Sequence, residues 1–67
     1  MSELRNRLKE LRAERNLTQS DLAEQIGVSR KTINTVENGV FVPSTVLALK
    51  LAAALGRKVE EIFSLEA

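Results

Sequence analysis

The stretch Thr18–Asn38, TQSDLAEQIGVSRKTINTVEN, contains two consecutive helix-start signals and decides the fold. In the first signal, Thr18 is an N-cap residue, and Asp21 three positions later forms a weak capping box with it. The second signal begins at Ser29, which can cap a helix in the same way. Between them, Gly27 can take the left-handed conformation that ends one helix and redirects the chain. This order of signals predicts a helix-turn-helix unit over residues 18–38.

Apolar periodicity and breaker residues extend this unit to five short helices. The expected helices cover about 3–15, 19–25, 30–37, 45–55 and 59–63. Ser2 is the expected cap of the first helix, and Ser44, directly after Pro43, is the expected cap of the fourth. Arg57 and Lys58 stand where the fifth helix begins, and cations there oppose the helix dipole. The predicted fold is all-α, a compact bundle of five short helices.

Length and composition restrict what this bundle can do. A chain of 67 residues allows one small core, so residues 1–67 are expected to form a single domain. The sequence has neither Cys nor His, which removes disulfides, thiolate and imidazole chemistry and most zinc sites. We therefore expect no enzyme, no catalytic residue, no metal and no cofactor. No apolar run is long enough for a membrane span and no secretory leader is visible, so a cytoplasmic location is expected.

The charge balance gives only a weak indication of a partner. The net charge is +1, so bulk charge alone does not point to a nucleic acid. The distribution is more informative, because residues 1–31 hold most of the basic side chains. Acidic side chains share that segment, however, and the excess of positive charge there is modest.

The helix expected over residues 30–37 has one apolar and one polar face. At 100° per residue, Ile33 and Val36 point inward. The opposite face offers two cations, an amide and two hydroxyls without an acid: Arg30, Lys31, Thr32, Asn34 and Thr35. Such donors match guanine acceptors, adenine edges and phosphates in a major groove. An ordinary solvated helix face can carry the same residue types, so this pattern alone leaves both interpretations open.

The arrangement resembles the phage repressor and Cro family of helix-turn-helix proteins. The positions that carry the resemblance are Gln19, Leu22, Ala23, Ile26, Gly27, Val28, Ser29, Ile33 and the run Val36-Glu37-Asn38-Gly39. It extends from about Leu4 to Phe63 and is closest to the small stand-alone bacterial repressors of that family. A helix-turn-helix pattern alone is a weak signal. Here it is combined with the run Glu37-Asn38-Gly39, a following Pro-Ser helix start and a matching chain length, which makes the resemblance more specific.

The resemblance implies a sequence-specific DNA-binding transcriptional regulator, with repression as the family default. It places the 30–37 helix in the major groove. The residues expected to read bases are then Arg30, Lys31, Asn34 and Thr35. Those expected to contact backbone phosphates are Thr18, Gln19, Ser29, Thr32, Asn38 and Ser44. An antitoxin-like autoregulator or a restriction-system controller would have nearly the same sequence. For Gln19, an ordinary polar residue of a first helical turn is the less favoured alternative.

The loop after the 30–37 helix departs from the family. Similar proteins often have a basic residue at the position of Val40, so one phosphate contact is expected to be missing. Phe41 is expected in the core, with an exposed, partner-binding position as the alternative. This apolar loop and the low net charge leave a second function open, a protein-interaction domain that has lost DNA binding.

Arg12 and Glu37 fall on the inward faces of their helices. Unpaired ions there would be costly, so the sequence favours a pair between them. Similar repressors carry Arg and Glu at the matching positions, and the resemblance implies a largely buried structural ion pair. This pair would hold the 30–37 helix against the first helix.

One recognition helix reads few base pairs, so a homodimer on a near-palindromic operator is expected. Residues 56–67 are the expected dimerisation region. The expected interface residues are Leu49, Val59, Phe63 and Leu65, because this third of the chain has more apolar surface than so small a core can bury. Double-stranded DNA and a second copy are thus the expected partners, with no membrane and no evident small-molecule ligand.

Overall fold

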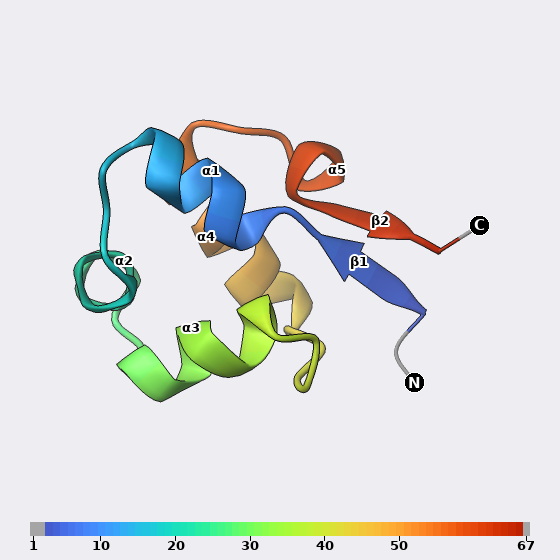
Figure 1. Ribbon diagram of the computed structural model, residues 1–67, viewed down its shortest axis with the longest axis horizontal. Helices are drawn as coiled ribbons and strands as arrows, with labels where there is room; N and C mark the ends of the chain where they lie inside the picture. The colour runs from blue at the N-terminus through green and yellow to red at the C-terminus, as the bar shows by residue number, and fades with distance from the viewer. Residues whose placement is uncertain (1–2, 67) are drawn as a thin grey trace.

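The computed structural model describes residues 3–66 (Figure 1). Its elements are β1 (Leu4–Asn6), α1 (Leu8–Glu14), α2 (Gln19–Ile26), α3 (Arg30–Glu37), α4 (Thr45–Leu55), α5 (Val59–Ile62) and β2 (Phe63–Leu65). The mostly helical fold with five helices is therefore confirmed, and the bounds of α3 and α4 agree with those expected. The cap expected at Ser2 lies outside the described residues.

The first helix begins later than the sequence pattern suggested. Its expected start near Glu3 is wrong, because Leu4–Asn6 form a strand that pairs antiparallel with Phe63–Leu65 at the other end of the chain. The Asn6 side chain then accepts a hydrogen bond of 3.0 Å from the Leu8 backbone N–H at the start of α1. Leu4 still packs against the core, but from a strand. The apolar spacing in this segment is also typical of a helix, but the segment pairs as a strand with residues at the other end of the chain, which local periodicity cannot reveal.

The fifth helix ends one residue early, since Phe63 already belongs to β2. Its start is stabilised by carboxylates rather than by a Ser-like cap. The Lys58 backbone N–H donates to Glu61 Oε1 over 2.9 Å. Arg57 lies 2.7 Å from Glu14 and 3.4 Å from Glu61. These acids offset the two cations that oppose the helix dipole at this position.

The helix-turn-helix unit has the local structure that its signals predicted. Thr18 Oγ1 accepts from the Asp21 N–H, and Asp21 Oδ2 accepts from the Thr18 N–H, each over 2.9 Å, so the capping box is complete. Ser29 Oγ accepts from the Thr32 N–H over 3.1 Å and starts α3. Gly27 has a φ of 74° and ends α2 in the left-handed conformation. The turn thus fixes the direction in which α3 leaves α2.

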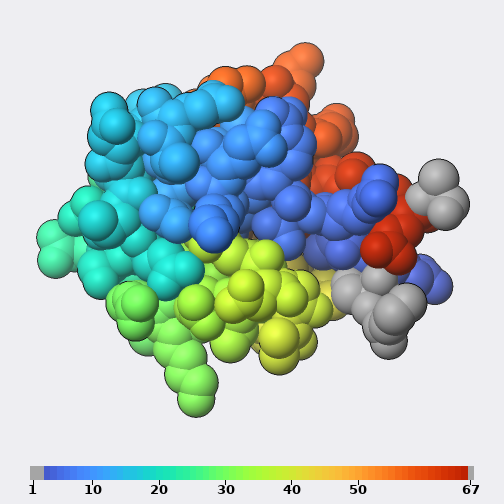
Figure 2. Space-filling model, in the orientation of Figure 1, coloured from blue at the N-terminus to red at the C-terminus, as the bar shows by residue number. Residues whose placement is uncertain are grey.

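All five helices contribute to one apolar core. Its fully buried side chains are Leu8, Leu11, Leu22, Ile33, Val36, Leu51, Leu55 and Ile62. Fully burying one such side chain contributes roughly 1.5–3 kcal/mol, so the inward face of α3 is firmly held. In Figure 1, α3 lies along one side of the molecule with α1 and α5 on the opposite side. Figure 2 shows that the start of α3, in light green, projects beyond the rest of the surface.

Candidate nucleic-acid interface

The outward face of α3 carries the side chains that the sequence predicts to read bases. Arg30 and Lys31 are exposed, while Asn34 and Thr35 are partly exposed. Within residues 3–66, neither Arg30 nor Lys31 takes part in an ion pair. The structure therefore brings these four residues together on one accessible face with its positive charge uncompensated.

Hydrogen bonds within α3 determine what this face still offers. Thr35 Oγ1 donates to the Thr32 carbonyl over 3.0 Å, so its proton is used within the helix. Asn38 Nδ2 donates to Asn34 Oδ1 over 3.2 Å, which leaves the Asn34 amide N–H groups available. Donors therefore dominate the accessible groups, in keeping with acceptors such as guanine N7 and O6.

Several residues expected at phosphates lie where helices start. Thr18, Ser29 and Ser44 are the N-caps of α2, α3 and α4, and all three are exposed. Their oxygens accept from backbone N–H groups, as Ser44 Oγ does from Leu47 N over 3.1 Å. Ser29 and Thr32 also share one hydroxyl bond of 3.0 Å. Helix N-termini favour anions, so this placement is compatible with the predicted phosphate contacts.

Gln19 has a partner that sequence reasoning missed. Its Nε2 donates to Glu37 Oε1 over 3.0 Å, and the residue is only partly exposed. An ionised carboxylate can only accept, so this bond fixes which end of the amide faces Glu37. The amide of Gln19 keeps one N–H and its carbonyl for other partners. The signal was absent from local sequence because the two residues lie 18 positions apart.

Arg12 and Glu37 meet in an ion pair. Arg12 Nε lies 2.7 Å from Glu37 Oε2, and the side chains are only 13% and 3% exposed. Arg12 Nη2 adds a longer bond of 3.4 Å to Glu37 Oε1. Arg12 Nη1 donates to the Leu17 carbonyl over 2.7 Å. With Gln19, this network ties α1, the start of α2 and the end of α3 together.

The expected core position of Phe41 is wrong, because this residue is 46% exposed. The neighbouring Val40 is 78% exposed and Val42 is 61% exposed. Two backbone hydrogen bonds hold the loop against α3: Val40 N and Phe41 N both donate to the Thr35 carbonyl, over 2.9 and 3.2 Å. These bonds keep the loop that carries Phe41 beside the end of α3, where the Phe41 side chain stays exposed.

The residues expected at a dimer interface differ in accessibility. Leu49 and Leu65 are 56% and 78% exposed, whereas Phe63 is 8% exposed and Val59 is partly buried. Leu49, Val59 and Phe63 line one mostly apolar hollow, together with residues that include Leu4 and Pro43. Leu65 pairs with Leu4 of its own chain. Phe63 thus serves mainly the core of its own chain, and the accessible apolar surface comes from Leu49 and Leu65.

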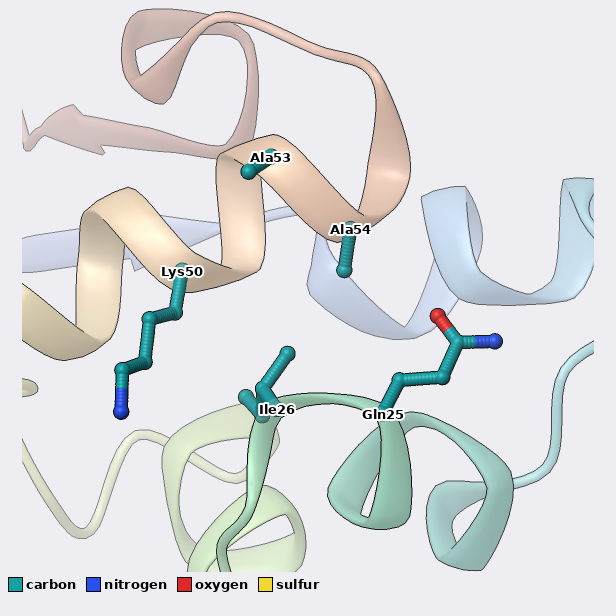
Figure 3. Close-up of a pocket in the computed structure, with 5 residues that line it drawn as sticks. All are labelled: Gln25, Ile26, Lys50, Ala53 and Ala54. Carbon is teal, nitrogen blue, oxygen red and sulfur yellow. The ribbon is translucent and has the colours of Figure 1, made fainter.

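A second hollow lies between α2 and α4 (Figure 3). Ile26, Ala53 and Ala54 give it apolar walls, and Gln25 and Lys50 are its polar residues. One cation and one amide form no acid–base or nucleophilic constellation. Within residues 3–66, no cluster of His, Cys, Asp or Glu could hold a metal ion, and no helix is both long and apolar enough to span a bilayer.

Comparison with known proteins gives consistent matches. A family model described as "Helix-turn-helix" matches residues 8–62. A protein of Methanocaldococcus jannaschii is 51% identical over 63 residues, which cover 94% of this chain and 96% of the relative. A protein of Bacillus subtilis is 44% identical over the same length, with the same coverage of both chains. Both are named as uncharacterized HTH-type transcriptional regulators.

A solved structure also resembles the fold. The restriction-modification controller protein C.AhdI from Aeromonas hydrophila superimposes with a TM-score of 0.78 at 42% identity. The match covers 82% of this chain and 83% of that protein. The relatives include an archaeal protein, so proteins similar to this chain are not confined to bacteria and phages.

Proposed function

This chain belongs to the helix-turn-helix family of transcriptional regulators, and from that premise we propose that it is a sequence-specific DNA-binding repressor. The family expected from the sequence is thereby confirmed, and it is a family of regulators rather than enzymes. In this proposal, the protein acts in the cytoplasm by occupying an operator.

The observation that carries this proposal is the contrast between the accessible and the engaged groups of α3. Arg30 and Lys31 are exposed cations without an acidic partner in the described part of the chain. The other side of the same helix is buried in the core, which holds α3 in this orientation. A donor-rich helix that projects from a fixed scaffold fits a major groove, which accepts one α-helix.

Repression follows most simply from occupancy. A protein seated in the major groove, with its caps on the flanking phosphates, excludes other proteins from the same base pairs. The proposed phosphate contacts orient the helix, and the proposed base contacts of Arg30, Lys31, Asn34 and Thr35 provide the sequence information. No cofactor or reaction is required for this mode of action.

The proposed active species is a homodimer on a near-palindromic site. Two copies would place two α3 helices on half-sites about one DNA turn apart, roughly 34 Å. Support comes from the exposed Leu49 beside the apolar hollow that Val59 and Phe63 line, and from the exposed Leu65. Burying this surface against a second copy would remove apolar area from water.

Selection from a randomised duplex library, followed by footprinting of bound genomic fragments, tests the function. We expect a recovered near-palindrome and an affinity that falls steeply between low and moderate salt, because phosphate contacts release counterions. Failure to enrich any sequence, together with weak binding to all duplexes at low salt, would favour the protein-interaction alternative.

Control of a restriction-modification system is a second candidate, supported by the 42% identity to C.AhdI. Genomic footprinting distinguishes it from general repression. Binding upstream of the protein's own gene and a restriction gene would favour the controller, whereas binding upstream of unrelated genes would favour the general repressor.

A further inference from the structure

A hollow with mostly apolar surface lies at the edge of the outward face of α3. It is lined by Ser29, Lys31, Thr32, Thr35, Val40 and Phe41. Two of these residues, Lys31 and Thr35, are among those proposed to read bases. The hollow therefore belongs to the surface that would face DNA, but its chemistry differs from the cationic groups around it.

Both threonine hydroxyls of this hollow already have a hydrogen-bond partner within the chain. Thr35 Oγ1 donates a hydrogen bond to the Thr32 carbonyl over 3.0 Å. The Thr32 hydroxyl is bonded to Ser29 Oγ over 3.0 Å. Each of these hydroxyls thus has a local partner, and the threonine methyl groups are available for apolar contacts.

Val40 and Phe41 form the other wall and cannot easily withdraw. Their N–H groups both bond to the Thr35 carbonyl, which fixes the loop against the helix. Gly39 permits this path with a φ of 72°, in the left-handed region. Val40 and Phe41 are 78% and 46% exposed. An aliphatic and an aromatic side chain are thus held open to a ligand beside a recognition helix.

Among the bases, thymine matches this combination. It carries the C5-methyl group in the major groove, with the O4 acceptor beside it, and Thr methyl and Phe are suited to contact that methyl group. Lys31 lines the hollow and has a donor that can reach such an acceptor. A cytosine offers an amino donor at the corresponding place, which Lys31 would oppose.

We propose that this hollow receives the C5-methyl group of one thymine in each operator half-site, with Lys31 donating to an adjacent base acceptor. This inference rests on the proposed function and adds a specificity determinant to it. It also gives the Val40–Phe41 loop a role in base recognition in place of the phosphate contact that a basic residue would make.

Replacing single thymines of the selected operator by uracil tests the inference, because uracil lacks only the methyl group. We expect one position in each half-site at which affinity falls by about fourfold, the value for about one buried methyl group. All other thymines should tolerate the change. Fluorescence anisotropy with labelled duplexes measures the affinity for the thymine operator and for each uracil-substituted operator.

The variant Phe41→Ala then shows whether the hollow is responsible. It should bind the thymine and the uracil operators with nearly equal affinity, so that the effects of the two changes are not additive. Val40→Ser gives a second test at a more exposed position, in case Phe41→Ala perturbs folding. Val46→Ala is the matched control, because Val46 is 63% exposed but does not line this hollow. It should keep the full preference for thymine.

The outcomes separate this inference from the proposed function. If a specific operator is found but none of its thymines is sensitive to replacement by uracil, the proposed thymine contact is wrong and the proposed repressor function still stands. Sensitivity to uracil that survives in both Phe41→Ala and Val40→Ser would also overturn it, and would leave the exposed loop to a protein partner. If no operator can be selected at all, the proposed function itself fails.

Discussion

The two sides of α3 differ in how far their charges are matched. At its inward end, Glu37 is paired with Arg12 and accepts from Gln19, and its side chain is 3% exposed. On the outward face, Arg30 and Lys31 are exposed and have no acidic partner within residues 3–66. The same short helix thus has an internally satisfied side and an unsatisfied side.

This difference separates the fixing of the helix from the reading of DNA. A buried ion pair holds a helix in one position, because separating the two ions would leave an unpaired charge in a poorly hydrated place. An exposed cation costs little in the free protein, since water solvates it, and remains available to an acceptor. We therefore expect changes on the inward side to act on stability and changes on the outward side to act on recognition.

The largest effect is expected from breaking the inward pair. Arg12→Ala or Glu37→Ala should lower the free energy of unfolding by about 3–5 kcal/mol, because one buried charge stays without a partner. That is a large part of the stability of a small domain. Urea unfolding followed by circular dichroism measures it.

Arg7→Ala is the matched control for this experiment, because Arg7 pairs with Glu10 over 2.6 Å while both side chains are more than half exposed. It should change stability little. Replacing Arg12 and Glu37 together by apolar residues should recover much of the loss, whereas Arg12→Lys should not, since an ammonium cannot reproduce the two-bond contact. Single alanine variants as stable as the wild type would contradict a structural role for the pair.

The next effect in size concerns the outward face. Asn34→Ala should lower the preference for the operator over operators with one changed base pair by about 1–3 kcal/mol, with little change in melting temperature. Competition binding with single-base operator variants measures this preference. Unchanged discrimination at every position would remove Asn34 from the proposed base contacts.

A smaller effect is expected at the proposed dimer surface. Leu49→Glu should weaken self-association by about 1.5 kcal/mol, roughly tenfold in Kd, because it replaces buried apolar surface by a charge. Sedimentation equilibrium on and off DNA reports the change. A wild-type protein that stays strictly monomeric at micromolar concentration in both conditions would exclude the proposed dimer.

The smallest effect concerns the capping box that starts α2. Hydrogen bonds from the Thr18 backbone N–H, and then from its side chain, lower the pKa of Asp21 below its ordinary 3.8. A carboxylate with a lowered pKa contributes stability above its unfolded value, and this contribution is lost as the pH falls through the folded value. Asp21→Asn should therefore flatten the stability profile below pH 3.8. Thermal melts between neutral and acidic pH compare the two proteins, and parallel profiles would show that Asp21 contributes nothing.

Local signals were sufficient for part of this structure. Thr18, Gly27 and Ser29 set the ends of α2 and α3 through bonds that span only a few residues. The Arg12–Glu37 pair was also predictable, because two charges on inward faces need each other. In contrast, nothing near Leu4 indicates its pairing with Leu65, which lies at the other end of the chain.

The site was predictable in outline but not in its hydrogen bonding. Helical periodicity correctly placed Lys31 and Asn34 on the outward face. It could not show that Gln19 donates a hydrogen bond to Glu37 or that the Thr35 hydroxyl donates one to the Thr32 carbonyl, because these bonds depend on the final packing and on side-chain rotamers. The exposure of Phe41 was likewise hidden, since it follows from the turn at Gly39.

The most direct test of the outward face compares two lysines. Lys31 lies on α3, whereas Lys58 precedes α5 on the opposite side of the molecule in Figure 1, and both are exposed. The measurement is the ratio of affinities for the selected operator and a scrambled duplex, in wild type, Lys31→Ala and Lys58→Ala at one salt concentration. We expect Lys31→Ala to lower this ratio at least tenfold, about 1.4 kcal/mol, and Lys58→Ala to preserve it. Equal ratios in all three proteins, or a loss confined to Lys58→Ala, would contradict recognition by α3.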